Sequence, residues 1–169
     1  MSKYETPEYA VIATEEPYEI RQYESFYIVE YENVNDPEIN NGFGTLFRYI
    51  SSENAEKKKI NMTVPVIEEM TADGLKMAFV VPKEHWEKTP SPNNPNLSVK
   101  EFDHGLFAVI RYSGFSNTSK ERIKLEMLES WIVRNGYKKV SNAMLAFYNA
   151  PFTPPMFRRN EIMIRVEAN

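Results

Sequence analysis

The chain contains two histidines, His85 and His104, which are the first side chains to weigh for metal chemistry. A protein metal site usually draws on several ligands at set spacings, such as two histidines one helical turn apart. Neither histidine has such a partner in the sequence. A lone imidazole can still serve as the single axial ligand of an iron-containing cofactor. His85, which follows an apolar run, is therefore kept as a tentative metal ligand, although most histidines of this kind are simply solvated or hydrogen-bonded.

The residue patterns of common enzyme classes are missing from the sequence. The chain has no cysteine, and it has no Gly-x-Ser-x-Gly elbow for serine catalysis. The stretch Gly42-Phe43-Gly44 lacks the later glycine and lysine of a phosphate-binding loop. Adjacent acids such as Glu68-Glu69 point to opposite faces of a strand, so they cannot act as a catalytic pair. The sequence therefore predicts a protein without catalytic residues.

An aromatic stripe offers a more promising binding feature. Phe43, Leu46, Phe47 and Ile50 recur with the spacing of one helical face, which predicts a helix over residues 39–51. The stripe has two interpretations. In the first it is ordinary core between helix and sheet. In the second, part of it lines an apolar cleft, with Met62 on the following segment as a second wall.

Cations lie close to this stripe in the sequence. Arg48 is part of the same predicted helix, and the run Lys57-Lys58-Lys59 follows it. Either could bind the carboxylates of a flat apolar ligand, because such groups form charge-assisted hydrogen bonds with arginine and lysine.

The remaining elements follow from hydrophobic period and turn residues. Strands are predicted over residues 9–13, 18–31, 59–68, 75–81, 97–102, 106–112, 143–148 and 160–166, with Asp73-Gly74 as a hairpin signal. A proline-rich connector spans residues 89–96. The strongest helix covers residues 119–135; Thr118 or Ser119 would cap it, and Gly136 would end it. Its predicted apolar stripe consists of Ile123, Met127, Trp131 and Leu128.

These elements repeat. A unit of two strands, a helix and two strands occurs over about residues 8–88 and again over 97–167, within a single domain of 169 residues. Two such units bury their apolar faces best by combining. We therefore predict an α+β fold with a curved, mostly antiparallel sheet of about eight strands, or a distorted barrel, and two main helices outside it.

Composition sets further limits. The net charge is −4, with acids and bases interspersed, so the sequence has no large cationic surface for nucleic acid. The first residues lack the apolar run of a signal peptide, and no stretch reaches the length of a membrane span. We expect a soluble, cytoplasmic protein without a membrane span. The sequence identifies no protein partner.

Three segments carry a family resemblance that extends over nearly the whole chain. They are YEIRQY (18–23), KINMTVPV (59–66), and YNAPFTPP (148–155) with RRNEI (158–162). In this order they resemble the SOUL haem-binding protein family. The resemblance implies a duplicated fold and non-covalent binding of haem or another tetrapyrrole in an apolar cleft beside the first helix. In this chain that cleft corresponds to Phe43, Phe47, Arg48 and Met62.

Some members of the family use a histidine in the loop before that helix, but residues 32–38 contain none. Two alternatives to a haem carrier, buffer or sensor therefore stay open. One is an effector-binding domain for a different flat or cationic small molecule. The other is a protein–protein interaction module that uses the amphipathic helix from Glu121 to Arg134. Asn149, Asn160 and Glu161 of the family motifs are interpreted as polar groups that fix turns and strand ends.

Overall fold

The structure is a computed structural model that describes residues 4–33, 35, 41–72, 74–150 and 152–169. The chain forms two compact units, each described here by itself. Unit 1 consists of Met1–Pro7 and Ser25–Asp103, and unit 2 consists of Glu8–Glu24 and His104–Asn169. The hairpin at residues 9–23 thus belongs to unit 2, although it comes first in the chain.

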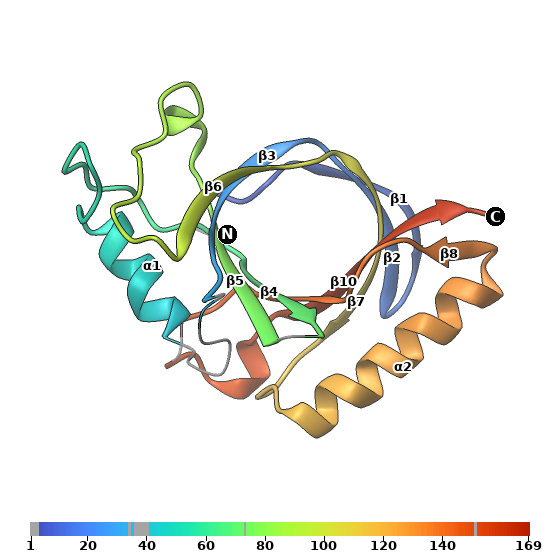
Figure 1. Cartoon of the computed structure of the whole chain (residues 1–169). Coiled ribbons are helices and arrows are strands. Elements are labelled where there is room, and N and C mark those ends of the chain that lie inside the picture. The colour runs from blue at the N-terminus through green and yellow to red at the C-terminus, as the bar shows by residue number, and fades with distance from the viewer. Residues whose placement is uncertain (1–3, 34, 36–40, 73, 151) are drawn as a thin grey trace. The chain divides into compact units, whose positions relative to one another are not determined.

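Unit 1 is a four-stranded antiparallel sheet with one helix on it (Figure 1). Its elements are β3 (Phe26–Tyr31), α1 (Gly42–Ile50), β4 (Val66–Thr71), β5 (Gly74–Val80), the short 3-10 helix η1 (Lys83–His85) and β6 (Leu97–Phe102). The strand order is β4-β5-β3-β6. The helix α1 packs on β3 and β5, because Leu46, Tyr49 and Ile50 bury against Val29 and Phe79 in one apolar cluster.

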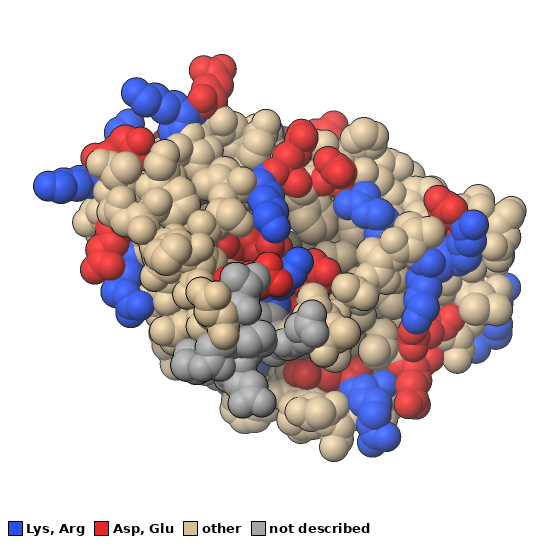
Figure 2. Space-filling view, in the orientation of Figure 1, with Lys and Arg blue, Asp and Glu red and all other residues tan. Residues whose placement is uncertain are grey.

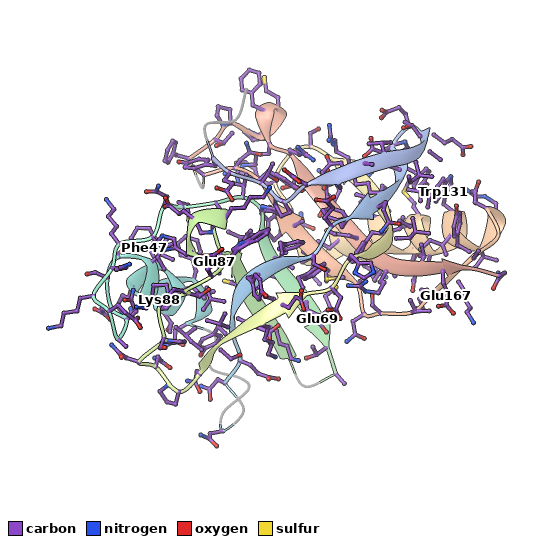
Figure 3. All side chains as sticks on the ribbon, turned by 90° about the horizontal axis from the view of Figure 1, so that it is seen from above. Phe47, Glu69, Glu87, Lys88, Trp131 and Glu167 are labelled. Atoms are coloured by element: carbon purple, nitrogen blue, oxygen red, sulfur yellow. The ribbon has the colours of Figure 1, made fainter. Side chains whose placement is uncertain are left out.

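Unit 2 repeats this arrangement with additional strands. Its elements are β1 (Tyr9–Glu15), β2 (Tyr18–Tyr23), β7 (Gly105–Tyr112), α2 (Thr118–Arg134), β8 (Tyr137–Lys139), β9 (Met144–Phe147), the 3-10 helix η2 (Pro155–Phe157) and β10 (Asn160–Ala168). The order is β1-β2-β7-β10-β9, and β8 also pairs with β10. Trp131 extends from α2 and stacks on Tyr18 with ring centroids 5.0 Å apart (Figure 3).

The duplication predicted from the sequence is present in the strand order. If β2, β3, β4 and β5 are matched with β6, β7, β9 and β10, both sheets have the same order. However, β2 pairs with β7 in unit 2, and β6 pairs with β3 in unit 1. Each half of the sequence therefore contributes its first matched strand to the sheet of the other half. The sequence repeat and the compact units consequently have different boundaries.

The predicted α+β class, the antiparallel pairing and the two main helices are confirmed. The expected strand count of about eight is too low, since the described residues form ten. The short strand β8 was missed, and residues 18–31 form two strands. The strand predicted over residues 59–68 begins at Val66, because Pro65 has no amide hydrogen to donate to a sheet. The hairpin β4–β5 forms as predicted, although Asp73 lies outside the described residues, as do residues 36–40 before α1.

Helix α2 differs from its prediction in its cap and in its buried face. The side chain of Asn117 caps it by accepting a hydrogen bond from the Lys120 amide at 2.9 Å, so neither Thr118 nor Ser119 is the cap. Leu128 and Trp131 are buried as predicted. The third buried residue of the helix is Ile132. Ile123 is 52% exposed and Met127 is 36% exposed, so these two predicted members do not belong to the buried face. A role of α2 in protein binding stays a prediction.

Charged side chains are interspersed over the face of the molecule shown in Figure 2. Within the described ranges, no helix has the length and apolar character needed to cross a membrane.

Candidate functional site

The outer face of α1 carries two partly exposed phenylalanines. Phe43 is 45% exposed and Phe47 is 50% exposed. They stand one helical turn apart, and their rings lie nearly parallel, at an interplanar angle of 16° and a centroid distance of 6.1 Å. Figure 3 marks Phe47 on this helix. Large apolar side chains normally avoid water, so an exposed aromatic pair is a candidate contact surface for a ligand.

The aromatic pair is supported by the core of unit 1. Phe43 makes an edge-to-face contact with the buried Phe79 of β5, with ring centroids 5.4 Å apart. Leu46 and Ile50 are buried in the core of unit 1. The stripe that the sequence predicts as one helical face therefore divides into a core-facing half and a half-exposed aromatic half. The core interpretation holds for Leu46 and Ile50, and a ligand cleft at Phe43 and Phe47 stays a prediction.

Arg48, the residue after Phe47, places a cation on the same helix, where its guanidinium lies near Gly44 and Thr45. Its Nη1 atom lies 3.5 Å from the point that a Cβ atom on Gly44 would occupy, so the guanidinium lies close to this glycine. Its Nη2 atom donates to the Thr45 hydroxyl at 3.3 Å, and its Nε atom lies 3.7 Å from an exposed Glu53 carboxylate oxygen. Because Gly44 has no side chain, no side chain projects from the helix surface at this position, between Phe43 and Arg48. In the sequence, Gly44 was considered only as part of a phosphate-loop motif, although a glycine within a helix is also a signal of close approach.

Met62 lies apart from this helix face. It is half-buried, packs against the apolar cluster that contains Phe79, and lines a separate cavity of about 450 Å³. That cavity is also lined by Tyr4, Glu5, Asn61, Thr63, Pro82 and Glu84. Phe43 and Met62 therefore both pack on the core of unit 1, but neither phenylalanine of the aromatic pair lines the cavity at Met62.

The two histidines occupy different environments. His85 ends η1, its side chain is only 12% exposed, and its Nε2 atom lies 3.4 Å from a Glu84 carboxylate oxygen. No hydrogen bond to this buried nitrogen is present in the described part of the chain. His104 lies on the surface at the start of unit 2, where its backbone oxygen accepts a bond from Arg165. Among the described residues, no group of three histidine, aspartate or glutamate side chains converges on a metal position.

Unit 2 contains a second cluster of charged groups, which is buried. The Glu161 carboxylate receives two 2.7 Å bonds from Arg21, one of 3.0 Å from Arg159 and one of 3.3 Å from Arg111. Burial by itself would raise the pKa of Glu161. The hydrogen bonds and charges of Arg21 and Arg159 outweigh that effect and hold its pKa below the ordinary 4.5. Since every strong partner is part of the protein, we assign this cluster to structure.

This assignment refines what the sequence indicated for the last family segment. Asn160 fixes a turn as expected, since its side-chain amide donates to the Gly114 oxygen at 2.8 Å. Asn149 likewise accepts a hydrogen bond from the Arg159 amide. Glu161 does more than fix a strand end. It joins three neighbouring strands, because Arg21 lies on β2, Arg111 on β7 and Glu161 itself on β10.

The duplicated sheet order, with one helix on each sheet, defines a duplicated α+β protein. The sequence also matches the family described as SOUL heme-binding protein over residues 4–165, and the chain belongs to this family.

Solved structures show where else this fold occurs. The C-terminal domain of EcmrR is similar over 90% of this chain and 98% of its own, with a TM-score of 0.62 and 11% identity. An uncharacterized conserved protein from Listeria innocua reaches a TM-score of 0.63 at 12% identity, with 92% and 94% of the two chains covered. A protein described as a hydrolase from the same organism gives 0.60 at 10% identity, with the same shares covered. These likenesses concern the fold alone. No curated protein sequence matches the chain.

Proposed function

We propose that this protein binds haem or another tetrapyrrole non-covalently, as a carrier, buffer or sensor, on the face of α1 formed by Phe43, Gly44, Phe47 and Arg48. The observation that carries the proposal is the pair of parallel, half-exposed phenylalanine rings. A flat macrocycle that covers them removes apolar surface from water, and each square ångström removed is worth roughly 25 cal/mol.

The charges of this face also suit a porphyrin. A porphyrin bears carboxylates at its edge, and Arg48, the residue after Phe47 on α1, has 53% of its side chain exposed. Its pairing with Glu53 is long, at 3.7 Å, and exposed, so a ligand carboxylate can replace it at little cost. Phe43, Phe47 and Arg48 would hold the ligand. Met62 would contribute only through the core that supports Phe43.

The bound group would supply the iron chemistry. The tyrosine of α1, Tyr49, is a residue type that can ligate iron, but it is buried and its hydroxyl donates to the Pro90 oxygen. His85 stays a tentative axial ligand. For that role its buried Nε2 atom would have to become accessible, since the side chain is 12% exposed.

The test is a titration of the purified protein with hemin, followed by Soret absorbance. We expect a saturable, sharpened band, and Phe47→Ala should raise Kd about tenfold through the loss of roughly 1–1.5 kcal/mol of ring contact. Phe152→Ala is the matched control, because Phe152 is 88% exposed but lies in unit 2. A broad band that does not saturate, or equal effects of the two substitutions, would show that hemin merely adheres to apolar surface.

A flat organic cation is the alternative ligand, and the charges of the site argue against it. Such a ligand needs an acidic partner, whereas the charged side chain beside Phe47 is Arg48, and the buried Glu161 is already paired with three arginines. A titration with a flat cationic dye, in parallel with hemin, separates the two ligand classes. Stronger binding of the dye would favour an effector-binding domain.

A further inference from the structure

A pocket of about 690 Å³, lined by both polar and apolar surface, opens beside the end of α1. It is lined by Thr45, Arg48, Tyr49, Ser52, Glu53, Asn54, Lys57, Asn93, Asn94, Pro95 and Leu97. All these residues belong to unit 1, and neither Phe43 nor Phe47 is among them. The pocket is thus distinct from the aromatic face, although Arg48 borders both.

The walls of the pocket are held in place by internal hydrogen bonds. The buried Asn54 side chain donates to the backbone oxygens of Tyr49 and Lys58 and accepts from the Lys58 amide. The connector at residues 89–96 is fastened to this loop, since the Ala55 amide donates to the Ser91 oxygen at 2.9 Å. The Ser91 amide in turn donates to the Glu56 carboxylate at 2.9 Å. Both walls are therefore preorganised, which lowers the entropy lost when a ligand binds.

In the turn after α1, Ser52 adopts a backbone conformation that is unfavourable for serine. The Glu53 amide bonds to the Arg48 oxygen and the Ser52 amide to the Tyr49 oxygen, which is the pattern of a Schellman helix end. The position of Ser52 in this motif favours glycine, yet its φ is 110°. Helix α2 uses the expected residue at the equivalent place, Gly136, with φ 80°. The sequence thus places a hydroxyl at the pocket where a glycine would suit the backbone better.

The donors at the pocket outnumber its acceptors. Lys57, which also has a positive φ of 53°, and Arg48 face a single acid, Glu53. Within the described residues, the side chains of Ser52, Lys57 and Asn93 form no hydrogen bond or ion pair with the protein. The side-chain oxygen of Asn94 accepts from the Asn96 amide, so its NH2 group faces outward as a further donor. An ammonium, a guanidinium, a hydroxyl and amide donors together match an oxyanion.

From this arrangement we infer that the pocket is a binding site for a small polar molecule bearing a carboxylate or phosphate group, held by Lys57, Arg48 and the Ser52 hydroxyl. The inference does not depend on tetrapyrrole binding, because the aromatic pair contributes nothing to the pocket.

The experiment is an NMR titration of the full chain in chloride buffer at constant ionic strength, with sodium phosphate and, separately, with citrate as probes. We expect saturable shifts of the backbone amides of Ser52, Lys57 and Asn94. Lys57→Gln should raise Kd about tenfold, because a charge-assisted hydrogen bond is lost. Lys138→Gln is the matched control, since Lys138 is also exposed but lies in unit 2, where it pairs with Glu167. Saturation by only one probe identifies the class of oxyanion.

Two further variants separate this inference from the others. Ser52→Gly should weaken oxyanion binding several-fold, because the hydroxyl is lost. The same substitution removes the backbone strain and should not destabilise the protein, so a loss of affinity cannot result from unfolding. Phe47→Ala should leave oxyanion binding unchanged even if it abolishes hemin binding. Shifts that stay linear with probe concentration, or equal losses in Lys57→Gln and Lys138→Gln, would overturn the inference whatever the outcome with hemin.

Discussion

The Arg21 guanidinium and the Glu161 carboxylate form a two-bond ion pair between side chains that are both fully buried. Nη1 lies 2.7 Å from Oε1 and Nη2 lies 2.7 Å from Oε2, across 140 residues of sequence. The Tyr23 hydroxyl accepts a third bond from Arg21 at 3.0 Å, and Glu19 binds its Nε atom at 2.7 Å. A buried charge of this kind is stable only while its partner remains.

Glu161→Gln should therefore destabilise the protein strongly. The substitution removes the carboxylate that accepts two bonds from the buried Arg21 and leaves only the partly exposed Glu19 as its acidic partner, which costs about 3–5 kcal/mol. Urea denaturation measures the change in the free energy of unfolding. Glu167→Gln, on the same strand but 57% exposed and paired with Lys138, should change it by less than about 0.5 kcal/mol. A loss of under 1 kcal/mol in Glu161→Gln would contradict a structural role for this pair.

The same pair predicts how stability depends on pH. The pKa of Glu161 in the folded protein lies below its ordinary value of 4.5, so the folded state favours the ionised form. The stability contributed by this group is fully present above pH 4.5 and is lost as the pH falls through the lowered pKa. Thermal unfolding between pH 7 and pH 2 should therefore show a steeper acid loss in the wild-type protein than in Glu161→Gln. Parallel curves for the two proteins would count against this linkage.

Ser52→Gly should raise the stability of the protein. Glycine accepts the positive φ of 110° without a steric penalty, and the gain should be about 1 kcal/mol. The reciprocal change at α2, Gly136→Ser, should cost a similar amount, because φ there is 80° and nothing within 4 Å obstructs the new Cβ atom. Differential scanning calorimetry measures both changes. A lower Tm for Ser52→Gly would mean that the hydroxyl stabilises the turn itself.

The two sides of α2 should respond differently to truncation. Leu128 is fully buried, so Leu128→Ala should cost about 2–5 kcal/mol by leaving a cavity. Ile123 is 52% exposed, so Ile123→Ala should change the free energy of unfolding by no more than about 0.5 kcal/mol. Chemical denaturation of both variants is the measurement. A large loss in Ile123→Ala would show that this side chain is covered in solution by another molecule, which would support a protein-binding role for α2.

Local sequence signals predicted the elements with few errors. Alternation and helical spacing are properties of neighbouring residues, so they identified α1, α2 and most strands, and Gly136 was correctly placed at the end of α2. The same signals failed at Ser52, because nothing in the neighbouring residues indicates that a serine occupies a glycine position. They also failed at β8, because three residues are too few to show a period.

The sequence by itself determined the α+β class, the duplicated pattern and the family of this protein, since each depends only on the types of the residues and their order along the chain. Only the tertiary structure decided which residues share a surface. It divided one apolar stripe into the buried Leu46 and the half-exposed Phe47, and it brought Lys57 to the same pocket as Asn94. It also buried Glu161 against Arg21 of β2 and Arg111 of β7, which both lie far from it in the chain. Burial and partnership depend on contacts between distant segments, and the period of a single segment carries no information about them.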